Sequence, residues 1–195
     1  MSDTPKVRNL TETVLSDGWT PLKSVSFEVR RRDGRWDAQT REVFARADAA
    51  AVLPYDPERG TVLLVRQFRL PALLRGEAGD LVEACAGLLD GDPPQVCAAK
   101  EAHEELGCRL GSLEFAFEAY SSPGSVTEKL FCFAATYSAA DRTGPGGGEE
   151  AEGEDIEVLE IALDDALAMV ARGEIRDAKT IMLLQHRKLA LLQGA

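Results

Sequence analysis

The sequence predicts an α/β (α+β) protein, an α/β/α sandwich built around a sheet of mixed strands, with a β-hairpin subdomain at its amino end. Short apolar runs typical of strands lie on both sides of a central helix pattern, and two amphipathic helix patterns close the chain. No regular strand–helix–strand alternation occurs along the 195 residues. This length fits one catalytic domain, expected over residues 46–195, and a small β subdomain over residues 1–45.

The amino-terminal subdomain is expected to be a hairpin. Over residues 22–31 the apolar residues alternate with polar ones, which is the period of a half-buried strand. Asp33-Gly34 then supplies a hairpin turn before a second strand at residues 36–45. Because an isolated hairpin is only marginally stable, we expect it to be buried against a second subunit in a homodimer.

The catalytic domain is expected to contain a second strand pair. Its apolar runs at residues 49–55 and 61–68 are separated by Pro57-Glu58-Arg59-Gly60, which has turn chemistry and no helical period. Further short apolar runs between turn residues predict strands at residues 81–84, 113–120, 130–137 and 156–162.

A central helix is expected over residues 94–106, because Pro93-Pro94 suits a first helical turn and Gly107 suits a carboxyl cap. The residues expected on its core-facing side are Val96, Ala99, Ala102 or His103, and Leu106. Two more amphipathic helices are expected over residues 164–171 and 178–192. Between the strands, the glycine-rich stretch at residues 144–148 predicts a mobile loop, with a solvated acidic linker as the alternative.

The charge of the chain restricts its partners. Lys and Arg total 22 against 33 Asp and Glu, a formal net charge of -11, which opposes binding to nucleic acid through a broad basic surface. A polyanionic ligand would need a metal ion. No run approaches the ~20 apolar residues of a membrane span and no leader pattern opens the sequence, so we expect a cytoplasmic protein with no membrane partner.

The four cysteines are not expected to bind zinc. Cys85, Cys97, Cys108 and Cys132 show no C-x-x-C spacing and do not cluster with the two histidines. Free cysteine is among the residues most often buried, so we interpret them as buried reduced thiols.

The central helix carries an acidic face. Glu101, Glu104 and Glu105 are spaced i, i+3 and i+4, which places their carboxylates on one side of the helix. Like charges so placed weaken a helix by roughly a few tenths of a kcal/mol per pair, a cost that is explained if divalent cations lie between them. Magnesium prefers such oxygen ligands together with substrate phosphates. By itself, an E-x-x-E-E pattern is more often a solvated helix face.

The surrounding segment, A-G-L-L-D-G-D-P-P-Q-V-C-A-A-K-E-A-H-E-E-L-G-C at residues 86–108, resembles the Nudix box, G-x5-E-x7-R-E-U-x-E-E-x-G-U, in which U is a bulky apolar residue. The second half matches from Lys100 onward. The first half departs, because Gly87 precedes Asp92 by one residue too few, Asp92 replaces the first glutamate, and Lys100 replaces the arginine. These positions shape the loop and brace a carboxylate, so metal binding is expected to survive.

The resemblance extends to the bacterial GDP-mannose pyrophosphatase branch of the Nudix hydrolases, over roughly residues 15–185. The segments that carry it are R-Q-F-R at 66–69, E-A-C-A-G-L-L-D at 83–90, S-P-G at 122–124, V-T-E at 126–128, the glycines at 146–148, E-D-I-E-V-L-E at 154–160, and E-I-R-D at 174–177 followed by K-T at 179–180. The fold implied is the Nudix α/β/α sandwich. The activity implied is Mg²⁺-dependent hydrolysis of the pyrophosphate bond of a nucleoside diphosphate sugar, with Mn²⁺ as a substitute.

The leading substrate is GDP-mannose, which would give GMP and mannose 1-phosphate. ADP-ribose and UDP-sugar pyrophosphatases share part of the same segments, so their substrates stay open as alternatives. A Nudix domain that binds a nucleotide sugar as a sensor without cutting it would normally lack some of the helix carboxylates. All of them are present here, which favours the enzyme.

The resemblance also implies metal ligands and catalytic residues. The implied metal ligands are the backbone carbonyl of Ala86 and the carboxylates of Glu101, Glu105 and Glu154. The implied catalytic residues are Glu101, Glu104, Glu105 and Glu154. Because Glu105 is itself an implied ligand, the general base stays open among Glu104 and the loop residues Glu149, Glu150, Glu152 and Glu154.

The implied substrate-binding residues are Trp19, Arg41, Glu42, Arg69, Ala86, Gly87, Glu128, Gly153 and Lys179. Among them, Trp19 would stack on the base, the three cations would face the phosphates or the sugar, and Glu128 would touch the sugar or the base. Two alternatives remain open. Trp19 is a core residue in one of them, since large aromatics are mostly buried, and Arg41 forms a surface ion pair in the other.

Overall fold

The computed structural model describes residues 6–194, with only the backbone at residue 152, and it divides the chain into two compact units. Unit 1 is the chain up to Ala47 together with Tyr120–Glu128. Unit 2 is Asp48–Ala119 together with the chain from Lys129 onward. Each unit is described by itself.

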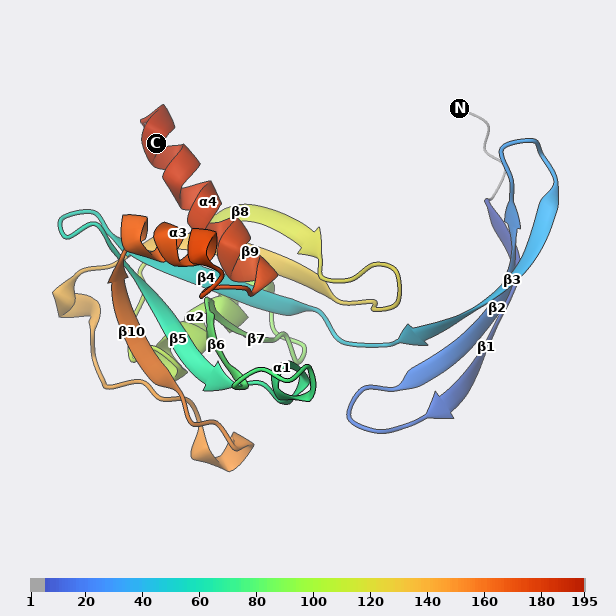
Figure 1. The fold of residues 1–195 in the computed structure, drawn as a ribbon, viewed down its shortest axis with the longest axis horizontal. Coiled ribbons are helices and arrows are strands. Elements are labelled where there is room, and N and C mark those ends of the chain that lie inside the picture. Colours follow the sequence, from blue (N-terminus) through green and yellow to red (C-terminus); the bar gives the residue numbers. More distant parts are fainter. Residues whose placement is uncertain (1–5, 195) are drawn as a thin grey trace. The chain divides into compact units, whose positions relative to one another are not determined.

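Unit 1 contains a three-stranded antiparallel sheet in the order β1-β2-β3 (Figure 1). Strands β2 (Leu22–Arg30) and β3 (Trp36–Phe44) form the expected hairpin, and Gly34 adopts the positive φ of 87° that its turn requires. Strand β1 (Val7–Ser16) was not expected. Its pairing with β2 is shifted in register between Arg8 and Thr11, where Asn9 takes a φ of 52°, and such a bulge interrupts the alternation that identifies a strand.

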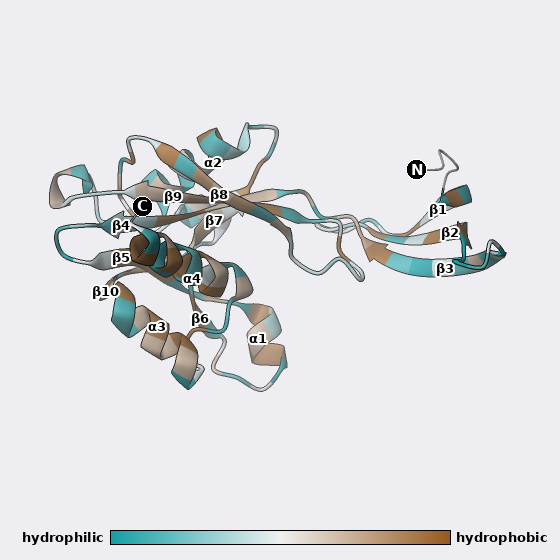
Figure 2. Cartoon of the chain, turned by 90° about the horizontal axis from the view of Figure 1, so that it is seen from above, coloured by the Kyte–Doolittle hydropathy of each residue, from teal (hydrophilic) through white to brown (hydrophobic). Residues whose placement is uncertain are grey.

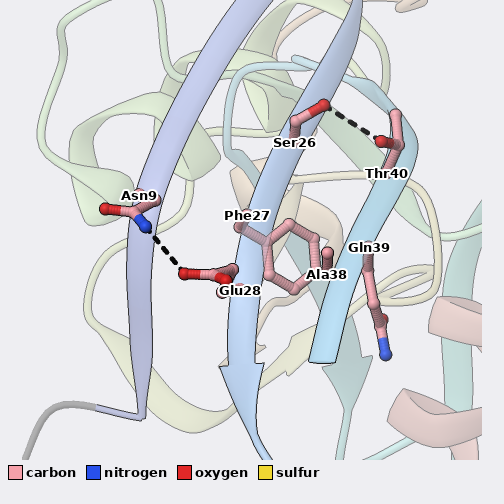
Figure 3. A pocket seen from close by; sticks show the side chains of 7 residues that line it. All are labelled: Asn9, Ser26, Phe27, Glu28, Ala38, Gln39 and Thr40. Carbon is pink, nitrogen blue, oxygen red and sulfur yellow. Dashed lines mark hydrogen bonds between the residues drawn. The ribbon is translucent and has the colours of Figure 1, made fainter. Parts of the chain in front are cut away.

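A shallow hollow of about 340 Å³ lies on this sheet (Figure 3). Within it, the Asn9 side-chain amide donates to a carboxylate oxygen of Glu28 at 2.7 Å, and the hydroxyls of Ser26 and Thr40 lie 3.0 Å apart. The residues that line it are Asn9, Ser26, Phe27, Glu28, Ala38, Gln39 and Thr40. The wall of the hollow is therefore a mixture of polar and apolar groups.

Unit 2 is built around a seven-stranded mixed sheet with the order β10-β5-β4-β9-β8, in which β6 also pairs with β5 and β7 with β4. Its strands are β4 (Ala49–Asp56), β5 (Thr61–Phe68), β6 (Asp80–Glu83), β7 (Cys85–Leu88), β8 (Leu113–Tyr120), β9 (Lys129–Thr136) and β10 (Glu157–Ala162). Strand β4 runs parallel to β9 and antiparallel to β5 and β7. The expected strands are confirmed to within about one residue, and β7 is an additional strand.

Helices cover both faces of this sheet (Figure 2). Helix α2 (Pro94–Glu104) packs on one face, and α3 (Leu163–Arg172) and α4 (Ala178–Gln193) pack on the other. Strand β4 is buried along its whole length, so its alternate side chains pack into two separate hydrophobic cores, one on each face of the sheet. The predicted α/β/α sandwich is confirmed.

The shorter elements are helix α1 (Leu70–Leu74), which was not expected, and the 3₁₀ turns η1 (Ala139–Asp141) and η2 (Glu150–Glu152). No helix in the part of the chain that is described is both long and apolar enough to cross a membrane.

The inward face of α2 differs from the expected one. Val96 is 52% exposed, whereas Cys97, Ala98 and Ala102 are buried against the sheet. These small side chains allow the helix to lie close to β7. Ala102 and Leu106 are buried as expected, whereas the expectation that Val96 faces the core was wrong.

The glycine-rich stretch is attached by backbone hydrogen bonds to the carboxyl end of α2 and the residues that follow it. Helix α2 ends at Glu104 with Glu105 as its carboxyl cap, two residues earlier than expected, and Gly107 beyond it takes a φ of 61°. The Gly107 carbonyl accepts from the backbone N–H groups of Thr143 and Gly144 at 2.8 and 3.2 Å. The N–H of Gly147 donates to the Glu105 carbonyl at 2.9 Å. The alternative of a merely solvated linker is therefore wrong, although mobility of this loop stays a prediction.

A matched pair of loop glycines tests this attachment. A Cβ added to Gly146 would lie 2.3 Å from the Glu105 carbonyl oxygen at a φ of 72°, whereas one added to Gly144 would meet nothing within 4 Å. We expect Gly146→Ala to destabilise the fold by at least about 2 kcal/mol and Gly144→Ala by less than about 0.5 kcal/mol, measured by urea unfolding. Equal stabilities of the two variants would contradict the attachment.

Candidate active site

Two glutamates of α2 reach the backbone of β7. The buried Glu105 carboxylate, 2% exposed, accepts a hydrogen bond from the Ala86 N–H at 3.2 Å. One turn earlier, the Glu101 carboxylate lies so close to Gly87 that a Cβ there would be 1.9 Å from its Oε1 atom. Position 87 therefore needs glycine because the carboxylate occupies the space of a side chain.

Burial makes Glu105 an unusually weak acid. Desolvation raises the pKa of Glu105 to about 7. The negative charges of Glu101 and Glu154 also raise this pKa, while a hydrogen bond with Cys85 opposes the shift. Glu101 and Glu154 thus both act on the pKa of Glu105.

The fastened loop brings Glu154 toward α2. Its carboxylate accepts from the Glu149 N–H at 2.9 Å, and a Cβ on Gly148 would lie 2.4 Å from the same carboxylate. The N–H of Gly148 in turn donates to the Glu104 carbonyl at 3.2 Å. The Glu104 side chain is half-buried and lies 3.7 Å from the Lys100 ammonium. Gly153 ends η2 with a φ of 76°, in open space.

A group of charged residues lies at the ends of β5, β6 and α4. The Arg69 guanidinium donates to both carboxylate oxygens of buried Glu83, at 2.7 and 3.1 Å, and Lys179 donates to the same carboxylate. Lys179 also lies 3.1 Å from Asp177. Desolvation opposes the charge on both cations, but Glu83 more than compensates and the pKa of Arg69 and of Lys179 is raised.

The sequence interpretation gave Glu83 no role. The structure makes it the common partner of two implied substrate-binding cations. A signal was available, because Glu83 stands in the apolar run L-V-E-A-C-A at residues 81–86, and a glutamate inside a buried strand is almost always paired.

A second hollow, of about 290 Å³, opens at the end of β5. The residues that line it are Arg66, Gln67, Phe68, Asp80, Asp155, Ile156 and Glu157. It therefore adjoins in sequence two implied site residues, Arg69 and Glu154.

Four implied substrate residues belong to unit 1 and not to unit 2. Trp19 is 91% exposed, so the alternative of a core residue was wrong. The Arg41 guanidinium donates to the Thr40 carbonyl and the Gln39 side chain, which are neutral partners and do not make the ion pair of the alternative interpretation. Glu128 is paired with Arg46 at 2.6 Å.

Arg41 and Glu42 lie on opposite faces of the unit 1 sheet. In the register of β2 and β3, Arg41 pairs with Val25 and Glu42 pairs with Ser24. Successive side chains of a strand point to opposite faces, so a ligand on one face meets only one of the two.

Two protein-family profiles together match nearly the whole described chain. The profile described as the GDP-mannose pyrophosphatase NudK N-terminal domain matches residues 6–44, and the NUDIX domain profile matches residues 45–184. The chain therefore belongs to the Nudix hydrolase family.

Similar proteins cover nearly its full length. A GDP-mannose pyrophosphatase from Pectobacterium atrosepticum is 49% identical over 93% of this chain and 92% of its own. A GDP-mannose pyrophosphatase from Cronobacter sakazakii is 46% identical over 94% of this chain and 95% of its own. A solved structure described as an ADP compounds hydrolase has a TM-score of 0.75 at 18% identity, over 100% of this chain and 99% of that one, which shows that the fold is shared.

Nudix hydrolases generally use a divalent metal ion. Within residues 6–194, no group of three or more His, Cys, Asp and Glu side chains is arranged so that it could hold a metal ion. The donor chemistry is nevertheless that of a hard cation. The pKa of Glu105, raised to about 7 by burial and by Glu101 and Glu154, also marks an unfavourable concentration of negative charge that a cation would relieve.

The pKa of Glu105 predicts how stability depends on pH. Because this pKa is about 7 in the folded chain, above the ordinary 4.5, the stability that its proton contributes is fully present below pH 4.5 and is lost as the pH rises through about 7. In excess EDTA, we compare the unfolding free energy of Glu105→Gln with that of wild type at pH 5 and at pH 8. The difference in favour of the variant should grow by up to about 3 kcal/mol between the two pH values, because only wild type loses the stability of the Glu105 proton. Urea unfolding at both pH values measures it, and a constant difference would refute the assignment.

Proposed function

We propose that this Nudix hydrolase cuts the pyrophosphate bond of GDP-mannose, giving GMP and mannose 1-phosphate, with Mg²⁺ as the metal and Mn²⁺ as a substitute. The observation that carries the proposal is the meeting of Glu101 and Glu105 with the backbone of Ala86 and Gly87. The names of relatives that are 46–49% identical over more than nine-tenths of the chain support the substrate.

The proposed metal ligands are Glu101, Glu105, Glu154 and the backbone carbonyl of Ala86. When bound there, a divalent ion would neutralise phosphate charge and lower the pKa of a bound water. The absence of a side chain at Gly87 lets the Glu101 carboxylate approach the backbone of β7 closely.

The chain's own cations complete the proposed chemistry. A diphosphate repels an attacking oxygen, and fixed positive charge stabilises the charge that spreads over the phosphate oxygens during transfer. Arg69 and Lys179 supply this charge from unit 2, and Glu83 and Asp177 hold them protonated. The general base is a carboxylate that is not used as a ligand, either Glu104 or an acidic residue of the fastened loop.

Unit 1 is proposed to supply base and sugar contacts. Trp19 exposes a large aromatic surface, 91% of the residue, that can stack on a nucleobase. Arg41 is proposed to contact the phosphates or the sugar, and Glu128 the sugar or the base. Glu42 is also proposed as a substrate-binding residue, from the opposite face of β3 to Arg41. Gly153 lies beside the implied ligand Glu154 in the fastened loop.

A substrate panel tests the chemistry. With Mg²⁺ we expect GDP-mannose to give the highest kcat/KM in a comparison with ADP-ribose and UDP-glucose, and no turnover in excess EDTA. Glu105→Gln should lower kcat by at least ~10³-fold, while Glu114→Gln, an exposed carboxylate of β8, should stay within twofold. Oxygen-18 water with mass spectrometry identifies the phosphorus attacked. Activity of Glu105→Gln within tenfold of wild type would overturn the metal role, and preference for ADP-ribose would overturn the substrate.

We further propose that residues 1–45 form the dimerisation subdomain of a homodimer whose catalytic domain is residues 46–195. Strand β1 exposes apolar side chains that a single chain leaves uncovered: Val7 at 39%, Leu10 and Val14 at 56%, and Leu15 at 51%. Exposed apolar groups of this kind favour association. A cytoplasmic location is supported by four buried free cysteines, which suit a reducing compartment.

Charge placed on β1 tests the assembly. Leu10→Glu combined with Val14→Glu should convert a dimer to a monomer in sedimentation equilibrium, because unpaired carboxylates cannot be buried in an interface without a large cost. The control is Leu74→Glu on α1, where the wild-type residue is 77% exposed, and it should leave the dimer intact. A wild-type monomer, or a dimer of the β1 variant, would contradict the proposal.

A further inference from the structure

Glu83 is a buried carboxylate shared by two cations from different elements. It is 2% exposed and ends β6, whereas Arg69 follows β5 and Lys179 lies in the first turn of α4. One carboxylate oxygen accepts from Arg69 Nε at 2.7 Å, and the other accepts from Arg69 Nη2 at 3.1 Å and from Lys179. A two-pronged contact of this kind fixes the plane of the guanidinium.

The exposure to solvent increases from Glu83 through Lys179 to Arg69. The side chain of Glu83 is 3% exposed, that of Lys179 11%, and that of Arg69 41%. The anion is therefore at the inner end of the group, and both cations retain surface that solvent, or a ligand, can reach. The charge of Glu105 is also among the causes that raise the pKa of Arg69.

A second set of contacts ties the same residues to the strand that carries Ala86. Asp177 caps α4, accepting from the Thr180 N–H at 3.0 Å and its hydroxyl at 2.5 Å, and lies 3.1 Å from the Lys179 ammonium. The Thr180 hydroxyl oxygen accepts from the Ala84 N–H at 2.6 Å. The short segment from Glu83 to Ala86 is thus held at one end by the charged group and at the other by Glu105.

We propose that Glu83 is a positioning residue for the hydrolysis, which holds Arg69 and Lys179 in fixed places toward the diphosphate without touching the substrate itself. The inference rests on the proposed function. Removing two charged groups from water is costly, and a pair that served stability alone would need only one cation for one carboxylate. The shared arrangement instead presets two cations, so that little reorganisation is needed when charge develops on the phosphates.

Three substitutions separate positioning from stability. Glu83→Gln removes the charge, and Glu83→Asp keeps the charge but withdraws it by one methylene, so it also covers the case in which the neutral variant does not fold. We expect each to lower kcat for GDP-mannose by about 10²-fold with a smaller change in KM. The control is Glu174→Gln, which breaks the exposed two-pronged pair with Arg172, and it should leave kcat within twofold.

A double-mutant cycle with Lys179→Met tests whether Glu83 acts through the cation. If it does, Glu83→Gln should lower kcat at least tenfold less in the Lys179→Met background than in wild type. Additive effects, or kcat of folded Glu83→Asp within threefold of wild type, would overturn the inference while leaving the proposed function intact. If wild type cleaves none of the nucleotide sugars, the proposed function fails. In that case the dissociation constant of GDP in the presence of Mg²⁺ is measured for the four proteins of the cycle. Additive effects of the two substitutions on the free energy of GDP binding would then overturn the inference.

Discussion

The close contact between α2 and β7 is the constraint on which the rest of the site depends. The Glu101 carboxylate occupies the volume that a side chain at position 87 would fill, and Glu105 is buried against the Ala86 N–H. This contact requires a glycine in the strand and small residues on the helix. It also concentrates negative charge inside the protein, as the pKa of Glu105, raised by burial to about 7, shows. Such a concentration is unfavourable without a cation.

The carboxylates beside this contact and the two cations paired with Glu83 form two distinct groups. The acidic group of Glu101, Glu105 and Glu154 suits a metal ion, and the group around Glu83 holds two cations charged despite burial. The separation explains how a chain with a net charge of -11 can act on an anionic diphosphate. Attraction comes from a few fixed charges and a bound cation, and no broad basic surface is needed.

Sequence periodicity predicted the sandwich because its strands and helices bury one or both faces in a regular pattern, as in β4 and α4. It failed at β1, where a bulge at Asn9 and complete exposure remove the pattern. The acidic face of α2 was predictable from spacing alone. Three features could not be predicted from the sequence, because they depend on packing between segments far apart in it. They are the exposure of Val96, the hydrogen bonds that attach the glycine-rich loop to α2, and the shared contacts of Glu83.

We propose above that the α2–β7 contact holds a divalent metal ion. Crystals of the wild-type protein soaked in Mn²⁺, with anomalous diffraction recorded near the manganese absorption edge, test it most directly. The account predicts anomalous peaks bounded by the carboxylates of Glu101, Glu105 and Glu154 and the carbonyl of Ala86. Crystals of Gly87→Ala, in which a new Cβ displaces the Glu101 carboxylate, should show weaker peaks. Strong peaks elsewhere, with none beside these residues, would contradict the account.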